Sequence, residues 1–276
     1  MPWSKGLSVE ETEVYYDDGS NFPDGKPSVH IVNEFSKAPT ILAEHPDFEL
    51  FQKGVHAKNG VACADCHLPY ASEGGSKFTH HSMSKPLENM DKSCLNCHGN
   101  KEKQLREIVA EKKQRVDTLG KKTLDNLAKA HLEAKKAWEA GAKEEEMKEA
   151  LNFIRKAQWR YSYVRSSFGA YFHATDESLR IYGDANDYAQ KARIEIIKVL
   201  AKHGVIGYEA PEFQTKEEVF KYANLPNREN FIKEKCEWIY ATGRKWLKEA
   251  KEKGTLSEEL YGIENSITWH DLNCKK

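Results

Sequence analysis

The chain has 276 residues, of which 39% are hydrophobic, so it is long enough and apolar enough to bury a core. Its 42 basic and 43 acidic residues give a formal net charge of −1, which provides no electrostatic argument for binding nucleic acid or an anionic membrane. No run of about 18 apolar residues occurs, which argues against a transmembrane helix. Partners must therefore be inferred from individual sites.

The first 50 residues are rich in glycine and proline, which predicts short helices joined by loops. Aromatic residues such as Trp3, Tyr15 and Phe35 provide apolar anchors, so this part is expected to be irregular but folded. The opening segment lacks the basic, apolar and small-residue pattern of a secretory signal peptide.

Residues 51–100 contain two C-x-x-C-H motifs, the signature of covalent c-type haem attachment. They consist of Cys63, Cys66 and His67, and of Cys94, Cys97 and His98. Two thiols three positions apart can bond to the two vinyl groups of one porphyrin, and the next residue supplies an imidazole to the iron. The sequence therefore predicts two haem c groups, with little regular structure around them.

A zinc ribbon is the competing interpretation, since two C-x-x-C pairs also suit a tetrahedral zinc site. The gap between Cys66 and Cys94 is longer than the usual ribbon spacing, and zinc gives no reason for a histidine after both pairs. Haem is therefore favoured. Cys236 and Cys274 have no partner pattern and are expected to be packed or free thiols.

From residue 101 the sequence becomes helical and highly charged. Residues 101–140 carry apolar side chains at helical spacing, which predicts one amphipathic helix of about 35–40 residues. This stripe consists of Leu105, Val109, Val116, Leu119, Leu127, Ala134 and Trp138. A helix this long beside a compact haem region leaves apolar surface uncovered, so part of it is expected to pack against a second subunit.

Further helices follow. One begins near residue 144 and carries an apolar stripe from Met147 to Tyr171, and the next has Thr175 or Asp176 as its N-cap and closes at Gly204. Weaker patterns predict helices over 215–222 and 227–253. The fold class is therefore mainly α, a multihaem cytochrome c with an irregular haem-packed part over 1–100 and a long-helix part over 101–276 that forms the dimer interface.

Nine of the eleven histidines lie outside the two motifs and could supply second axial ligands. A lone histidine is more often a surface residue than a ligand, but position raises some of them. The favoured set consists of His45, His56, His80, His81 and His173, whereas His30, His131, His203 and His270 are expected to be solvated.

Four stretches of this sequence resemble the C-terminal half of the ammonia-forming pentahaem cytochrome c nitrite reductases. They are "PWSKGLSVEETEVYYD", "SKAPTILAEHPDFELFQKGVHAKNGVACADCHLPY", "KFTHH" and "SCLNCHG". The resemblance runs from residue 1 to about 205 and is most specific between 36 and 98. It implies a periplasmic, dimeric oxidoreductase of nitrogen metabolism that reduces nitrite to ammonium with six electrons, drawn from a quinol-linked or cytochrome donor.

The resemblance also implies roles for individual residues. The first motif matches the attachment site of the family's fourth haem, with His173 as the distal ligand, and the second motif matches that of the fifth haem, with His56 as the distal ligand. His81, with a one-position uncertainty relative to His80, matches a ligand of the second haem. His45 matches the catalytic histidine, which holds nitrite and supplies protons, a role that suits an imidazole.

Departures from the family are equally informative. The family binds nitrite at a haem on a C-x-x-C-K motif, which does not occur here. The catalytic haem and its arginine and tyrosine would belong to a missing N-terminal half, so this chain is expected to be a fragment or truncated product. The family's calcium site maps to the Leu42 carbonyl and the Glu44 carboxylate, a good hard-oxygen ligand, although the remaining calcium ligands would lie in the missing half.

Two functions from different classes follow. The first is the C-terminal part of a nitrite reductase. The second is a stand-alone dihaem electron-transfer protein without nitrite turnover, in which His67 pairs with His173 and His98 with His56.

Overall fold

A computed structural model describes residues 2–81, 85–213, 215–223 and 228–256. The chain divides into two compact units, Met1–Ala210 and Pro211–Lys276. Helices make up most of the described residues, and strands occur only as two short pairs within them, so the expected mainly α fold is confirmed. The functional division at residue 100 stays a prediction.

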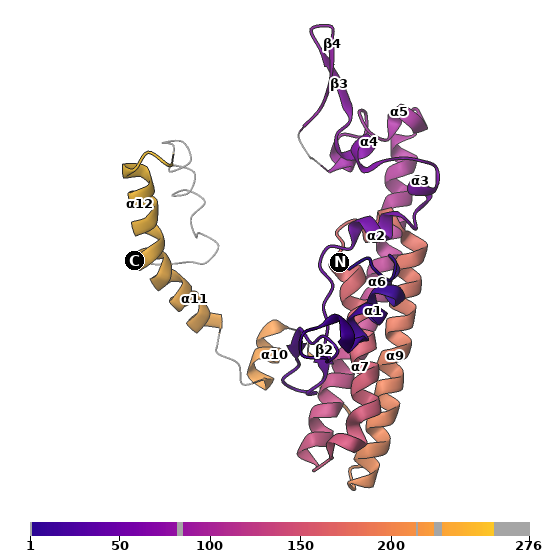
Figure 1. The fold of residues 1–276 in the computed structure, drawn as a ribbon, viewed down its shortest axis with the longest axis vertical. Helices are drawn as coiled ribbons and strands as arrows, with labels where there is room; N and C mark the ends of the chain where they lie inside the picture. The colour runs from indigo at the N-terminus through magenta and orange to yellow at the C-terminus, as the bar shows by residue number, and fades with distance from the viewer. Residues whose placement is uncertain (1, 82–84, 214, 224–227, 257–276) are drawn as a thin grey trace. The chain divides into compact units, whose positions relative to one another are not determined.

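Three long helices form the body of the first unit. They are α6 (Glu102–Glu139), α7 (Glu144–Arg165) and α9 (Thr175–Lys202), and they lie side by side (Figure 1). Helix α6 has 38 residues, as its apolar stripe predicts. Alanines such as Ala134, Ala157 and Ala189 are fully buried between the helices, so the backbones can approach closely.

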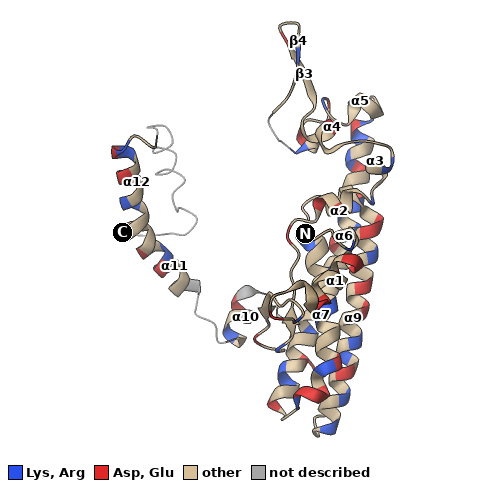
Figure 2. Cartoon of the chain, in the orientation of Figure 1, with Lys and Arg blue, Asp and Glu red and all other residues tan. Residues whose placement is uncertain are grey.

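Basic and acidic residues are interspersed along these helices, as Figure 2 shows. Many form ion pairs one helical turn apart, such as Lys191 with Asp187 at 2.6 Å. An exception lies between α6 and α9, where Arg193 donates to the buried carboxylate of Glu133 at 2.8 Å. The long helices therefore account for much of the high charge content.

The second long helix ends earlier than its apolar pattern predicts. Helix α7 stops at Arg165, Phe168 is 79% exposed, and Tyr171 belongs to a separate short helix, α8 (Ala170–His173). The prediction of a continuous stripe to Tyr171 is therefore wrong at its end. The physical reason is a carboxylate distant in sequence, Asp47, which accepts hydrogen bonds from the connecting segment.

The ends of α9 differ in how well the sequence predicts them. Thr175 is the first helical residue rather than the cap, and its hydroxyl donates to the Tyr171 carbonyl at 2.7 Å. At the other end the predicted closure at Gly204 is confirmed, because this glycine has a φ of +76° and Val205 N–H donates back to the Leu200 carbonyl.

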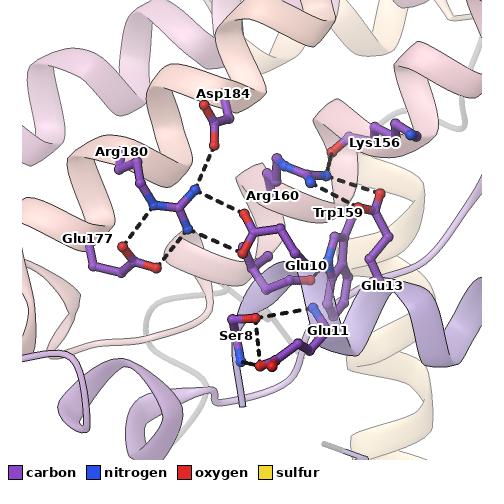
Figure 3. Close-up of polar contacts among 11 residues, drawn as sticks. Ser8, Glu10, Glu11, Glu13, Lys156, Trp159, Arg160, Glu177, Arg180 and Asp184 are labelled. Atoms are coloured by element: carbon purple, nitrogen blue, oxygen red, sulfur yellow. Dashed lines mark hydrogen bonds and ion pairs between the residues drawn. The ribbon is translucent and has the colours of Figure 1, made fainter. Parts of the chain in front are cut away.

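The N-terminal segment is held on the long helices by buried polar contacts. Helix α1 (Val9–Asp17) begins with a reciprocal cap between Ser8 and Glu11. Figure 3 shows Arg160 of α7 against Glu13, a pair at 2.9 Å. The indole of Trp159 donates to the Val9 carbonyl at 2.9 Å. After η1 (Gly19–Asn21), β1 (Ile31–Val32) pairs antiparallel with β2 (Pro39–Thr40).

His131 contradicts the expectation that it is solvated. It lies on α6, is 8% exposed, and its Nδ1 is 2.8 Å from the Ser36 hydroxyl. Burial lowers the pKa of His131 to about 4 despite a hydrogen bond with Gln158. The helical spacing of apolar residues predicts the core face of α6, but it does not reveal that the polar residue His131 also lies on that face.

The haem-motif region consists of short elements around the start of α6 (Figure 1). They are α2 (Asp47–Phe51), α3 (Val55–Lys58), α4 (Cys63–His67), η2 (Pro86–Glu88) and α5 (Leu95–His98). A hairpin of β3 (Tyr70–Glu73) and β4 (Ser76–Thr79) departs from the expectation of little regular structure in this region. Gly74 and Gly75 both have positive φ, as a two-residue hairpin turn requires.

The second unit is described by α10 (Lys216–Tyr222), α11 (Arg228–Trp238), the π-helical turn η3 (Ile239–Gly243) and α12 (Arg244–Glu252). These agree closely with the helices predicted over 215–222 and 227–253. Cys236 is disulfide-bonded, so the expectation of a packed or free thiol is wrong for it, while Cys274 lies outside the described residues. Within the described ranges no helix is long and apolar enough to cross a membrane.

Candidate haem-binding site

The first C-x-x-C-H motif forms α4, and its last residue, His67, faces a second histidine. The ring centroids of His67 and His173 are 6.4 Å apart, with an angle of 67° between the ring planes. His173 is the last residue of α8 and comes from a segment more than 100 positions further along the chain. The fold therefore brings together the two histidines that the resemblance pairs on one haem.

The second motif provides an equivalent pair. His98 ends α5 and its ring centroid lies 6.3 Å from that of His56 in α3, with an interplanar angle of 84°. The other face of His56 is covered by Phe172, whose ring stacks on it at 5.3 Å and 23°.

The spacing of both pairs fits a metal ion between two imidazoles. A ligating nitrogen lies about 2 Å from a first-row metal and about 1 Å from the centre of its own ring, so opposed rings have centroids about 6 Å apart. The pKa of His56 is lowered mainly by burial and next by the His98 ring. The pKa of His67 is lowered mainly by burial and next by the His173 ring. Both imidazoles are thus favoured as the neutral form that binds iron.

The four motif cysteines are free thiols, as covalent attachment to a porphyrin requires. Cys63 and Cys97 are exposed, and burial followed by the charge of Cys94 raises the pKa of Cys66. Among the residues that the structure describes, no cluster of three or more His, Cys, Asp or Glu side chains is arranged to hold a metal ion.

His173 sits in a tight seat formed by two glycines. A Cβ added at Gly169 would overlap the His173 imidazole, and one added at Gly54 would overlap the His173 carbonyl oxygen. Phe51 packs edge-on against the same imidazole at 5.7 Å. The ring is 18% exposed, and its Nδ1 is buried without a hydrogen-bond partner. The seat and the unpartnered nitrogen fit a ligand histidine.

Asp47 stands beside this seat. Its Oδ1 accepts a 2.6 Å hydrogen bond from the Ser167 hydroxyl and a 3.4 Å one from Gly169 N–H, and it lies 3.5 Å from His173 Nδ1. Burial of Asp47 opposes its charge, but these neighbours outweigh burial and lower its pKa. Sequence reasoning missed Asp47, Gly54 and Gly169, because only contacts distant along the chain reveal them.

His45 lies apart from the two pairs on an exposed loop. It has a φ of +49°, which is uncommon for a residue with a Cβ, and it precedes Pro46, which restricts its backbone further. Its ring packs on Phe168 at 5.9 Å. Backbone strain of this kind is typical of functional residues.

The remaining predicted site residues are not brought to the histidine pairs by any described contact. His80 and His81 follow β4 at the foot of the hairpin, where His80 N–H donates to the Pro69 carbonyl. Leu42 N–H donates to His30 Nδ1 at 3.1 Å, and Glu44 is exposed. Their roles stay predictions.

The chain is similar to known proteins. The family described as cytochrome c552 matches residues 1–258. Cytochrome c-552 of Desulfotalea psychrophila is 44% identical over 270 residues, which are 98% of this chain and 52% of that protein. Cytochrome c-552 of Aliarcobacter butzleri is 45% identical over 270 residues, again 98% of this chain and 53% of the relative.

A solved structure is also similar. The catalytic subunit of cytochrome c nitrite reductase from Desulfovibrio desulfuricans, whose structure has two calcium sites, aligns with a TM-score of 0.68 and 30% identity. The alignment covers 80% of this chain and 51% of that one. The chain spans about half the length of these relatives.

Proposed function

Because the chain belongs to the cytochrome c552 family, we propose that it is the C-terminal part of a cytochrome c nitrite reductase that converts nitrite to ammonium with six electrons. The observation that carries the proposal is the pair of opposed histidines at each C-x-x-C-H motif, 6.4 Å and 6.3 Å apart. Each arrangement closes both axial positions of an iron. These two sites therefore suit electron transfer rather than substrate binding.

Each proposed haem has its own set of protein groups. Cys63 and Cys66 would bond one porphyrin and His67 and His173 would hold its iron, while Cys94, Cys97, His98 and His56 would serve the other. Haem c supplies reversible one-electron storage when bound. Burial lowers the pKa of His56 and of His67, which favours the neutral imidazole, and Phe51, Gly54 and Gly169 pack around His173. His81 would ligate a third haem that another segment attaches.

His45 would act at the catalytic pocket. His45 is exposed and has a strained backbone, so its ring would be free to contact a substrate that binds at the surface of this chain. There the imidazole could donate a hydrogen bond or a proton to nitrite. The catalytic haem would lie on a C-x-x-C-K motif in the half of the relatives that this sequence does not cover. Calcium would bind beside it through the Leu42 carbonyl and the Glu44 carboxylate.

The two parts of the chain would have different roles, with residues 1–100 holding the haems and residues 101–276 forming a homodimer. Exposed apolar side chains on the long helices support this assignment. Ile194 and Ile197 of α9 are 53% and 51% exposed and stand three residues apart, on one face of the helix. The assembled enzyme would work in the periplasm, where c-type haems are attached, with a quinol-linked or cytochrome donor.

The second candidate is a stand-alone dihaem electron-transfer protein. It is favoured by the same geometry, because two closed iron sites exchange electrons without needing a substrate position. Its haems and ligands are identical to those above, but it would not turn over nitrite in any assembly.

Reconstitution distinguishes the two functions. The chain would be exported in a host with a c-type haem maturation system, alone or together with the part of the Aliarcobacter butzleri relative that it does not cover. We expect nitrite-dependent oxidation of a reduced viologen, with ammonium formed, only when both parts are present. Turnover by the chain alone would contradict the proposed division. An assembled, fully loaded complex without turnover would favour the stand-alone function.

A further inference from the structure

One carboxylate oxygen organises the segment that carries His173. Asp47 is the first residue of α2, and its Oδ1 contacts the hydroxyl of Ser167 and the N–H of Gly169, at 2.6 Å and 3.4 Å. These contacts end α7 and turn the chain into α8, so that His173 follows one helical turn later. The same oxygen lies 3.5 Å from His173 Nδ1.

The two nitrogens of His173 have different surroundings. The carboxylate lies beside Nδ1, which is buried and has no hydrogen-bond partner, at a distance slightly longer than a hydrogen bond. A ring movement of less than about 1 Å would bring Nδ1–H into hydrogen-bond range of Asp47. Nε2 then stays available as a ligand, and the His67 ring lies 6.4 Å away between centroids.

We propose that Asp47 is a positioning residue for the axial ligand His173: it accepts a hydrogen bond from Nδ1–H, leaves Nε2 for the iron, and lowers the reduction potential of that haem. A carboxylate partner fixes the tautomer of a ligating imidazole and increases its basicity, which favours ferric over ferrous iron. The inference rests on the proposed haem-binding function and identifies a further residue of that site.

The second histidine pair has a different environment. In the described part of the chain no carboxylate lies within ion-pair distance of His56 or His98, and the ring of His56 instead stacks on Phe172. The two haems would therefore differ in reduction potential, because Asp47 would lower the potential of the His67–His173 haem only. In its reduction one electron converts ferric to ferrous iron, and the Nδ1 proton stays on His173 in both states.

The test is a redox titration of the two-haem protein with dithionite, followed in the visible spectrum and fitted as two one-electron transitions. In Asp47→Asn we expect the midpoint potential of one transition to rise by up to about 59 mV, which corresponds to a tenfold change in the ferric-to-ferrous equilibrium. The other transition should stay in place, and Asp47→Glu should recover part of the shift. The low-spin ferric EPR signal of one haem should change in the same variant.

Two matched variants separate other causes. Asp176→Asn removes an equal charge from the exposed first turn of α9, three residues after His173. Ser167→Ala removes a hydrogen bond to Asp47 but keeps its charge. The proposal is overturned if Asp47→Asn shifts neither transition, if Asp176→Asn shifts the same transition equally, or if Ser167→Ala reproduces the whole shift. A protein without two low-spin haems would instead refute the proposed function.

Discussion

Gly54 packs directly against the carbonyl oxygen of His173, leaving no room for a Cβ between them. Gly54 is the cap of α3, which carries His56, while His173 belongs to the opposite pair. This contact therefore couples the elements that hold the two histidine pairs.

Gly54→Ala is expected to displace α8 and weaken ligation by His173. The added Cβ overlaps backbone, which cannot move aside as a flexible side chain would. We expect part of one haem to become high-spin, measured by visible absorption and EPR. Gly183→Ala on α9 is the matched control, since its Cβ would have no heavy atom within 4 Å. Identical spectra for the parent and Gly54→Ala would contradict the role of this contact.

His45→Asn tests the catalytic assignment. Asparagine tolerates a positive φ, so the loop should keep its backbone while losing the imidazole. We expect nitrite turnover of the reconstituted enzyme to fall by about 10²-fold or more, the usual contribution of acid–base catalysis. Both bis-histidine haem spectra should be unchanged. Activity within twofold of the parent would remove His45 from the catalytic pocket.

Glu13→Gln is expected to destabilise the fold by about 3 kcal/mol, because it leaves the buried guanidinium of Arg160 without its ion partner. The control lies on the same helix. Glu10→Gln weakens an exposed pair with Arg180, whose side chain also contacts Glu177 and Asp184, and should cost less than about 1 kcal/mol. Figure 3 shows both clusters. Urea unfolding of the two variants measures the difference, and equal losses would count against it.

Stability should depend on pH through His131. Its pKa is about 4 in the folded protein and near 6.5 when unfolded, so the unfolded chain takes up the proton first as the pH falls. The stabilisation is complete above about pH 6.5 and is lost toward pH 4, at about 1.4 kcal/mol per pH unit. In His131→Asn the free energy of unfolding should fall less steeply between pH 6.5 and 5. Parallel slopes would argue against a buried neutral imidazole.

The long helices could be predicted from the sequence because their apolar residues recur at a fixed spacing. That periodicity is local, and it located α6 and the closure of α9 at Gly204. The same periodicity did not predict the end of α7 at Arg165. Just beyond it, the Ser167 hydroxyl donates a hydrogen bond to Asp47, which is 120 positions away in the sequence. No local pattern encodes such a contact.

The histidine pairs could be predicted only in part. The motifs identify His67 and His98 as haem ligands by their chemistry. His56 and His173 are assigned as the partners of His98 and His67 only through the family resemblance. The fold then places each of them opposite its expected partner. The glycine seat and the carboxylate beside His173 needed the structure, since steric closeness between distant segments is not visible in composition or spacing.

We propose that this chain holds two haems and that a pair of histidines ligates the iron of each. The most direct measurement is a pyridine haemochrome count with a visible and EPR spectrum of the exported, matured protein. We expect two haems per chain, both low-spin, with no spectral change on adding nitrite. A colourless protein, or a high-spin haem that binds nitrite, would contradict the account.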